Sequence, residues 1–521
     1  MDYPYLDTVI YDSFYEMLKG RYETSSDNIA VRFMSDSKIT DITYRELTGH
    51  VASLYSWFRE NGYSGKHIAV VSENRYEYIV IYLAAVLDNV IIPLDRELDS
   101  GTLLKCLDDF DADLVFCTDK TADKIHDTSV TKVNTDTELR SVLEKESSVT
   151  EFFKSASGTD KDRFAVLAST SGTDGNIKGV MLSQYNVIVN VRGTLENNIL
   201  ENPTLAFLPM NHTYGFNPCM LATLYNGTTL CLCTQLKYLM RDIKTFDPFF
   251  FGAVPMVIEG MYDGIMREIK RRGKEKAFAR MVAVSRFFLK FKIDLRHIFF
   301  GNFINKRLRL VVNGGAALNS DLVDKFGDLG ITILNGYGLT ECSPTIAVSR
   351  TGNNVTGSAG TIMKNIDVKI ADDGEILVKG PNVMLGYYKN KEATDACMHD
   401  GYFATGDIGY TEDRVIFVTG RKKNLIITEN GKNVPPEYLE AKLAKLPYVA
   451  ESLVIPSRSG KATVLKALIV LKENEDGKTL SEDIKRINSE LPDYMHIDEH
   501  EIMKTGFEKN SSKKIRRNLY V

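Results

Sequence analysis

Several features that would place a chain of 521 residues in a special class are missing from this one. Apolar residues make up 44% of it and charged residues 26%, which indicates neither a disordered nor a fibrous protein. No apolar run approaches the roughly 18 residues of a membrane span, since Asp88 ends the run from Ile79 to Leu87. The acidic first residues lack the basic-then-apolar order of a signal peptide. These absences predict a soluble, cytoplasmic protein.

An excess of one charge and a regular cysteine pattern are also absent. The chain has 64 Lys and Arg against 69 Asp and Glu, a net charge of −5, so nothing predicts a nucleic acid as partner. The seven cysteines are scattered, and only Cys231 and Cys233 lie close together. Reduced cysteines explain this pattern better than a disulfide framework or a zinc site does.

Short apolar runs that alternate with helical stretches are what the chain does contain. Several runs end in a polar or glycine-rich loop, as Leu205–Leu208 and Ile331–Leu334 do. This alternation predicts an α/β fold, in which helices cover mixed or parallel sheets. Because ligands bind beyond the carboxyl ends of such strands, we expect the loops to lie close together.

The sequence texture changes beyond Gly374, where short strands are joined by turn residues. The stretch G-R-K-K at residues 420–423 is followed by a small α+β pattern. We therefore predict a large N-terminal domain over residues 1–420 and a small α+β C-terminal domain over residues 421–521.

One segment departs from the overall neutrality. Between Arg267 and Arg309 basic residues are frequent, and the only acidic residues are Glu268, Glu275 and Asp294. Interleaved with the basic residues are Phe278, Phe287, Phe288 and Phe291. A helix in peripheral contact with a membrane is one interpretation, and a solvated helical face over the core is the other.

The stretch T-S-G-T-D-G-N-I-K-G at residues 170–179 follows the apolar run Phe164–Ala168. Glycines let backbone N–H groups turn toward an anion, hydroxyls add donors, and a lysine suits phosphate oxygens. The spacing differs from G-x-x-x-x-G-K-[ST], because Lys178 follows the second glycine by three residues. Alone, such a stretch is a turn more often than a phosphate site. The other motifs of the chain must therefore show whether it binds phosphate.

Seven further motifs accompany this stretch along the chain. In order, they are L-P-M-N-H-T-Y-G (208–215), N-G-G-A-A-L (313–318), N-G-Y-G-L-T-E (335–341), G-E-I-L-V-K-G-P-N-V-M-L-G-Y-Y (374–388), Y-F-A-T-G-D (402–407), G-R-K-K-N-L-I-I-T-E-N-G-K-N-V-P-P-E-Y-L-E (420–440) and F-E-K-N-S-S-K-K-I-R-R (507–517). With those motifs, the stretch resembles the phosphate loop of the adenylate-forming superfamily of acyl-CoA synthetases, firefly luciferase and peptide-synthetase adenylation domains. The resemblance covers nearly the whole chain, and the hinge and last loop are most similar to long-chain fatty acyl-CoA synthetases.

The resemblance implies nucleotide-binding roles for the residues that match these motifs. Those on the phosphates of ATP would be Thr170, Ser171, Gly172, Thr173, Gly175 and Lys178. Those around adenine would be Gly315, Asn335, Gly336, Tyr337 and Gly338. Asp407 and Arg421 would bind the ribose.

The resemblance also implies residues for the chemistry. Glu341 would hold Mg²⁺ as a hard oxygen ligand, and Thr340 would contact the α-phosphate. His212 would lie beside the carboxylate substrate, and Lys514 would bridge that carboxylate and the α-phosphate. Lys423 would be the hinge of the C-terminal domain, which the resemblance implies is a mobile lid, and Gly431 would line the thiol tunnel.

The implied reaction has two steps. A carboxylic acid attacks the α-phosphate of ATP, which gives acyl-AMP and pyrophosphate, and a thiol then displaces AMP. Coenzyme A and the phosphopantetheine arm of an acyl carrier protein present the same thiol, so the acceptor stays open. A non-catalytic nucleotide-binding relative and a luciferase-like oxidative enzyme are alternatives of other classes.

The identity of the acid is argued from single positions. Amino-acid-activating relatives place an aspartate where this chain has Thr213, which argues against an amino acid. Apolar and small residues nearby suggest an apolar acyl group, and we expect a medium- or long-chain fatty acid. These residues are Phe216, Met220, Leu221, Ala316 and Ala317.

Overall fold

The computed structural model divides the chain into two compact units. The first comprises residues 1–318, 323–367 and 378–403, and the second comprises 319–322, 368–377 and 404–521. The structure describes residues 5–145, 147–158, 160–171, 177–233, 235–301, 305–316, 318–428, 432–459, 462–473, 475–509 and 515–520. Five predicted site residues lie outside these ranges, namely Gly172, Thr173, Gly175, Gly431 and Lys514. The predicted domain boundary after residue 420 stays a prediction.

The first unit contains two sheets, and the larger has a parallel centre. Its central strands follow the spatial order β1 (Ile29–Ser35), β10 (Leu230–Leu232), β9 (Thr204–Ala206), β11 (Phe250–Ala253), β12 (Leu310–Asn313) and β13 (Thr332–Gly338). Antiparallel strands flank this centre, namely β2 (Lys38–Thr43) beside β1, then β14 (Thr345–Val348) beside β13 and β15 (Gly360–Ile362) beside β14. The predicted α/β fold with mixed sheets is confirmed.

The smaller sheet carries the predicted phosphate loop. Its spatial order is β18 (Gly386–Tyr387), β8 (Ile177–Ser183), β7 (Phe164–Ser171), β4 (Val90–Leu94), β3 (His67–Val71), β5 (Leu114–Cys117) and β6 (Thr131–Asn134). The strands from β7 to β6 are parallel, whereas β7 and β8 form an antiparallel hairpin that pairs Thr170 with Lys178. The sequence predicted β7 but not β8. Lys178 was expected in a loop, and it lies in strand β8 instead.

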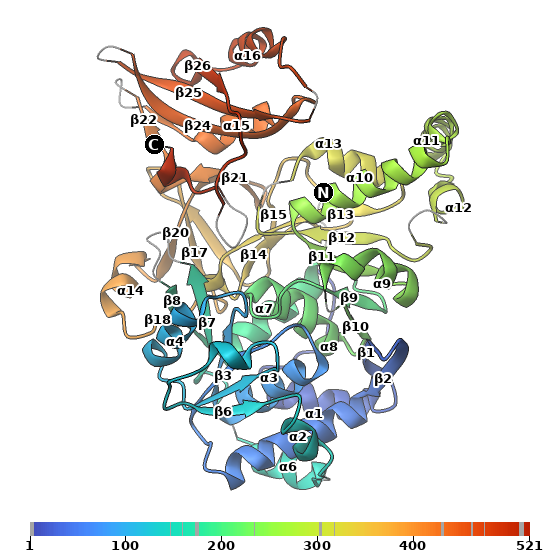
Figure 1. Ribbon diagram of the computed structural model, residues 1–521, viewed down its shortest axis with the longest axis vertical. Coiled ribbons are helices and arrows are strands. Elements are labelled where there is room, and N and C mark those ends of the chain that lie inside the picture. Colours follow the sequence, from blue (N-terminus) through green and yellow to red (C-terminus); the bar gives the residue numbers. More distant parts are fainter. Residues whose placement is uncertain are drawn as a thin grey trace. The chain divides into compact units, whose positions relative to one another are not determined.

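Two helices of the first unit are almost completely buried, and Figure 1 shows them among the strands. The first, α3 (Tyr76–Asp88), is apolar on nearly every side and packs on β3, β4 and β7. The second, α7 (Gln184–Asn197), begins with a capping box of Ser183 and Asn186 and packs on both sheets.

Further α-helices lie within residues 5–403. They are α1 (Phe14–Ser25), α2 (Tyr44–Glu60), α4 (Ser100–Asp109), α5 (Leu139–Leu143), α6 (Val149–Ala156), α8 (Ala222–Asn226), α9 (Leu239–Phe246), α10 (Pro255–Arg271), α11 (Glu275–Leu289), α12 (Arg296–Phe300), α13 (Ser320–Asp328) and α14 (Lys391–Cys397). A search of the described residues finds no helix long and apolar enough to cross a membrane.

The second unit is a small α+β domain with its own core, as the sequence predicted. One sheet has the order β24 (Val449–Ser459), β25 (Ala462–Leu471) and β26 (Ile497–Ile502). Its core is shared with α15 (Pro436–Leu443) and α16 (Leu480–Ser489). A further strand group has the order β16 (Asp367–Ile370), β17 (Glu375–Lys379), β20 (Tyr402–Glu412) and β21 (Val415–Arg421).

Candidate active site

Tyr387 connects the lysine of the predicted phosphate loop to the predicted magnesium carboxylate. It lies in β18, which pairs antiparallel with β8 and places Tyr387 opposite Val180. The Tyr387 hydroxyl donates a hydrogen bond to Glu341 Oε1 at 2.8 Å. The Lys178 ammonium lies over the Tyr387 ring, 5.2 Å from its centroid. The structure therefore brings Lys178 and Glu341 together on Tyr387, a side chain for which the sequence motifs imply no role.

The environment of Tyr387 keeps its hydroxyl a donor. Burial raises the pKa of the phenol, and the Glu341 carboxylate raises it further. The hydroxyl stays protonated and holds one carboxylate oxygen of Glu341, whose backbone carbonyl accepts from Met384 N at 2.8 Å. One carboxylate oxygen is thus held in place, and no described residue forms a hydrogen bond with the other.

The donor set around Glu341 fits Mg²⁺. The described residues include no group of three or more His, Cys, Asp and Glu that could hold a metal by themselves. Mg²⁺ is usually held by one or two carboxylates together with substrate phosphates and water. A single half-buried carboxylate near the phosphate-loop lysine matches this pattern.

Loops that follow β9, β12 and β13 lie together at the carboxyl ends of neighbouring strands. Thr213 Oγ1 is 3.4 Å from Thr340 Oγ1, which brings the loop that contains His212 (the histidine loop) next to the loop that contains Glu341. The Tyr214 hydroxyl donates to Val312 O at 2.7 Å. Its ring leaves no room for a side chain at Gly314, where a Cβ would lie 2.7 Å from Cζ.

The residues predicted around adenine are held by backbone geometry and by amide contacts. Gly315 has a φ of +81°, which L side chains rarely adopt. At Gly338 a Cβ would lie 1.8 Å from Pro344 O, so the close backbone contact requires glycine. The Asn335 side chain accepts a hydrogen bond from Asn313 Nδ2 at 3.2 Å and donates one to the Ser358 carbonyl at 3.1 Å. Gly336 and Tyr337 are half-buried in β13.

His212 is exposed on the loop after β9. Desolvation by the surrounding protein lowers the pKa of His212, and the Asp95 carboxylate opposes this effect. The imidazole is therefore mostly neutral at pH 7, so it offers a hydrogen bond rather than a second cation.

In the second unit, the two predicted ribose residues lie opposite each other. Asp407 in β20 pairs with Arg421 in β21, and Arg421 Nε is 2.7 Å from Asp407 Oδ1. Asp407 is buried and Arg421 is half-buried. Lys423 lies in the short 3₁₀ helix η5 (Lys422–Asn424), beside Lys422, which pairs with two carboxylates at 2.6 and 2.7 Å.

Comparison with known proteins decides the family. Residues 19–388 match the family model of AMP-binding enzymes. The chain belongs to this family. It is 28% identical to the long-chain-fatty-acid–CoA ligase FadD15 of Mycobacterium bovis over 490 residues, 85% of this chain and 80% of that protein. It is 30% identical to 4-coumarate–CoA ligase-like 2 of Arabidopsis thaliana over 380 residues, 69% of this chain and 61% of that protein.

A solved structure with the same fold is O-succinylbenzoate coenzyme A synthetase from Bacillus subtilis, in complex with ATP and magnesium ion. Its TM-score is 0.75 at 21% identity, and the match covers 96% of this chain and 98% of that chain. The resemblance to adenylate-forming enzymes, and among them to long-chain fatty acyl-CoA synthetases, is thus confirmed.

In this AMP-binding enzyme, Asn74 holds the loop that precedes His212. The Asn74 amide donates to Leu208 O at 2.8 Å and accepts from Met210 N at 3.0 Å. The Tyr78 hydroxyl donates to Met210 O at 2.9 Å. Nothing in the sequence pointed to Asn74, because its partners lie more than a hundred residues away and no local pattern signals them.

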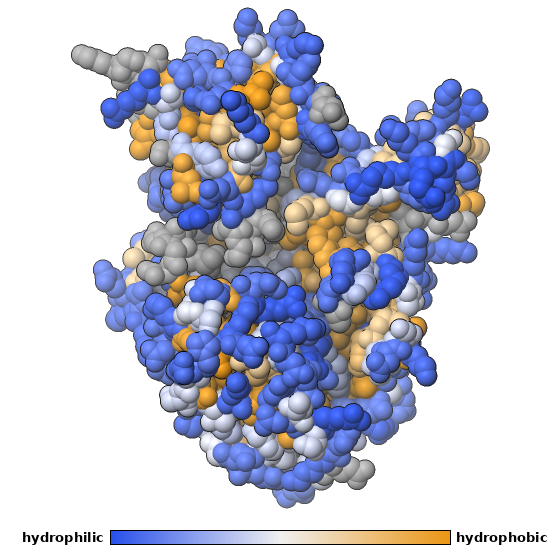
Figure 2. Space-filling view, in the orientation of Figure 1, coloured by the Kyte–Doolittle hydropathy of each residue, from blue (hydrophilic) through white to orange (hydrophobic). Residues whose placement is uncertain are grey.

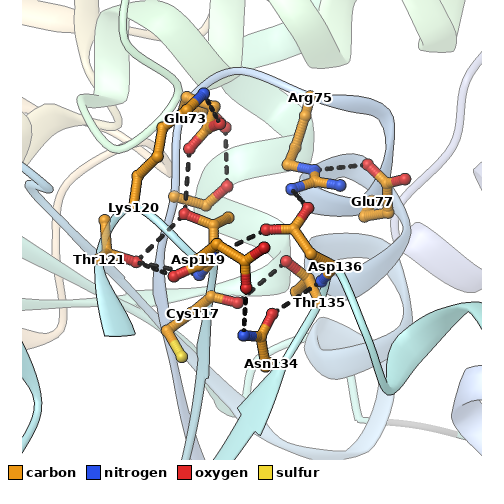
Figure 3. Close-up of polar contacts among 12 residues, drawn as sticks. Glu73, Arg75, Glu77, Cys117, Asp119, Lys120, Thr121, Asn134, Thr135 and Asp136 are labelled. Carbon is orange, nitrogen blue, oxygen red and sulfur yellow. Dashed lines mark hydrogen bonds and ion pairs between the residues drawn. The ribbon is translucent and has the colours of Figure 1, made fainter. Parts of the chain in front are cut away.

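The neighbours of Asn74 are fixed by a polar network at the ends of β3, β5 and β6 (Figure 3). Glu73 accepts from Lys120 at 2.7 Å, and Arg75 donates to Glu77 and Asp136, both at 2.6 Å. Burial opposes the charge of Glu73, but the bond from Lys120 holds the pKa of this carboxyl below its usual value. Both flanking side chains are anchored, which holds the backbone that presents Asn74.

We expect Asn74→Ala to lower kcat/KM for the acid about tenfold, with little change in KM for ATP. Two buried loop groups would lose their partner, and an unsatisfied buried group costs about 1–3 kcal/mol. Steady-state kinetics with acid and ATP varied in turn measure the effect, with the exposed Asn61→Ala as control. An Asn74→Ala enzyme that matched the control, or that lost affinity for acid and ATP equally, would contradict this positioning role.

Proposed function

We propose that this enzyme joins a medium- or long-chain fatty acid to coenzyme A, with ATP as co-substrate and Mg²⁺ as cofactor. In the first step, a carboxylate oxygen of the acid attacks the α-phosphate, and the bond to pyrophosphate breaks. In the second step, the thiol sulfur attacks the acyl carbonyl, and the bond to AMP breaks. The observation that carries the proposal is the meeting of Lys178, Tyr387 and Glu341 beside the hairpin of the phosphate loop.

Charge explains why these three residues belong together. Two anions must approach in the first step, and negative charge develops on the departing pyrophosphate. Lys178 supplies a cation for that charge, which is the kind of interaction that lowers such barriers most. Mg²⁺ held by Glu341 would supply further positive charge there, and Tyr387 would keep the carboxylate turned toward it.

The fatty acid is proposed from the relatives and not from a pocket. Phe216, Met220 and Leu221, which were expected to line an apolar acyl site, have 0% exposure. They pack in the core of the first unit and are no evidence for an acyl pocket. The relative with the longer match is named a long-chain-fatty-acid–CoA ligase. A 4-coumarate-like acid is the second candidate, because another relative is named for it.

A panel of acids in ATP–pyrophosphate exchange tests the substrate. We expect kcat/KM to rise from butanoate to longer acids by about fourfold per buried methylene and then to level off, since each CH₂ contributes about 0.8 kcal/mol. The panel also contains acetate, 4-coumarate, O-succinylbenzoate and amino acids. A higher kcat/KM for any of these would assign another acid, and no exchange with any acid would favour a non-catalytic nucleotide-binding relative.

The acceptor and the hinge are proposed from the resemblance. Coenzyme A is the proposed acceptor, and an acyl carrier protein is the alternative that an assay with either thiol distinguishes. We propose Lys423 as the hinge about which the C-terminal domain turns between the steps. Gly431, proposed for the thiol tunnel, lies outside the described residues.

A further inference from the structure

Helix α11 has a second apolar face that is turned away from the protein. Only Ser285 of its 15 residues is buried. Its inner side packs through residues such as Phe278, whose ring is 5.4 Å from that of Phe300. On its outer side, Val284 and Phe287 are 43% and 55% exposed, and Phe291 just beyond the helix is 63% exposed. Several large apolar side chains gathered in one exposed place mark an interaction surface more often than a single one does.

The exposed residues share one side of the helix. Residues three or four positions apart lie on the same face. In the sequence, this spacing aligns Lys276, Arg280, Val284, Phe287 and Phe291. The rings of Phe287 and Phe291 are 5.3 Å apart, so they form one apolar surface. In Figure 1, α11 lies beyond the end of α10 and away from the strands of its own unit.

The charge around this face is strongly positive. Residues 267–309 contain fourteen basic and three acidic residues. Two of the acids, Glu268 and Asp294, pair with arginines of the same segment. Among the described residues, no ion pair is formed by Lys276, Arg280 or Lys290. Figure 2 shows hydrophilic residues beside apolar ones where α11 lies.

We propose that the outer face of α11 docks on an anionic lipid surface. The face is defined by Lys276, Arg280, Val284, Phe287, Lys290 and Phe291. Basic side chains bind anionic headgroups, while aromatic rings beside them enter the boundary between headgroups and acyl chains. An acidic protein would satisfy the lysines and Arg280, but it would not by itself explain two exposed phenylalanines within the same face. This choice between the two interpretations of the basic segment depends on the exposure of one helix face, and it does not rest on the proposed substrate.

Sedimentation of the full-length protein with vesicles tests the proposal. Vesicles of phosphatidylcholine alone are compared with vesicles that also contain phosphatidylglycerol, at low and high salt. We expect binding to the anionic vesicles that weakens as salt rises, because headgroup attraction is screened. Binding that is absent from anionic vesicles, or equal on both kinds, would overturn the proposal.

Two sets of variants separate the apolar and the charged parts of the face. Phe287→Ser with Phe291→Ser should weaken vesicle binding about tenfold, and its control is Val9→Ser with Ile10→Ser, two apolar side chains that are 53% and 69% exposed. Lys276→Gln, Arg280→Gln and Lys290→Gln together should weaken it about a hundredfold, since each basic residue contributes roughly fivefold. The control for that set is Lys38→Gln, Lys154→Gln and Lys244→Gln, at exposed positions elsewhere.

Pyrophosphate exchange and circular dichroism check that every variant is folded, so a loss of vesicle binding without loss of exchange supports the lipid surface. Test and control sets that bind vesicles equally would overturn it. Two other outcomes would assign the face to another partner and also overturn the proposal. One is binding to an acidic acyl carrier protein but not to vesicles, and the other is a wild-type dimer that Phe287→Ser with Phe291→Ser converts to a monomer in sedimentation velocity.

Discussion

Lys514→Ala should slow ATP–pyrophosphate exchange about a thousandfold, the upper end of the loss for one removed donor to a developing charge. The expectation follows from the resemblance of the last loop to that of acyl-CoA synthetases, in which this lysine would bridge the carboxylate and the α-phosphate. Lys514 itself lies outside the described residues. Turnover of pre-formed acyl-AMP with coenzyme A should be unchanged, because the second step does not need that bridge.

Measuring both half-reactions on the same preparations makes this prediction specific. Lys504→Ala, at an exposed position of the same unit, is the matched control and should leave both rates unchanged. Lys423→Pro restricts φ to about −65° and should show the opposite pattern, with exchange kept and thioester formation lost. Equal losses of both half-reactions in both variants would mean that no domain turning separates the two steps.

Glu341→Gln should slow pyrophosphate exchange by about a hundredfold to a thousandfold, because a neutral amide replaces the carboxylate proposed to hold Mg²⁺. Tyr387→Phe should slow the exchange less than Glu341→Gln does. It removes the 2.8 Å hydrogen bond to Glu341 but leaves the charge, and the loss of such a supporting bond weakens metal binding about tenfold to a hundredfold. A titration of exchange rate against Mg²⁺ concentration measures both effects.

The next residue provides the control for this series. Tyr388 also donates its hydroxyl to a carboxylate, that of Asp111 at 2.6 Å, but it has no contact with Glu341 among those the structure describes. Tyr388→Phe should therefore titrate with Mg²⁺ like the unaltered enzyme. If Glu341→Gln exchanged pyrophosphate at the normal rate, the metal assignment would be wrong, and if Tyr387→Phe matched Tyr388→Phe, the supporting role of Tyr387 would be wrong.

Features that depend on neighbouring residues were predictable from the sequence. The run from Ile79 to Leu87 is apolar at every position, and α3, which contains it, is buried because it is apolar on nearly every side. The motifs with glycines, hydroxyls and single charges predicted which loops carry the chemistry, since a loop's composition limits what its backbone and side chains can bind. The family could be predicted for the same reason, because it is defined by the order of such motifs.

Features that depend on distant partners were decided by the tertiary structure. The pairing of β18 with β8 places Tyr387 between Lys178 and Glu341, and no local pattern specifies which strands pair. The hydrogen bond from Asn74 to Leu208 O, which holds the loop before His212, joins residues 134 positions apart. Phe216, Met220 and Leu221 suggested a ligand lining but became core, while Phe287 and Phe291 of the basic segment stayed exposed. A sequence determines which side chains are apolar, but which of them other elements cover depends on how the whole chain packs.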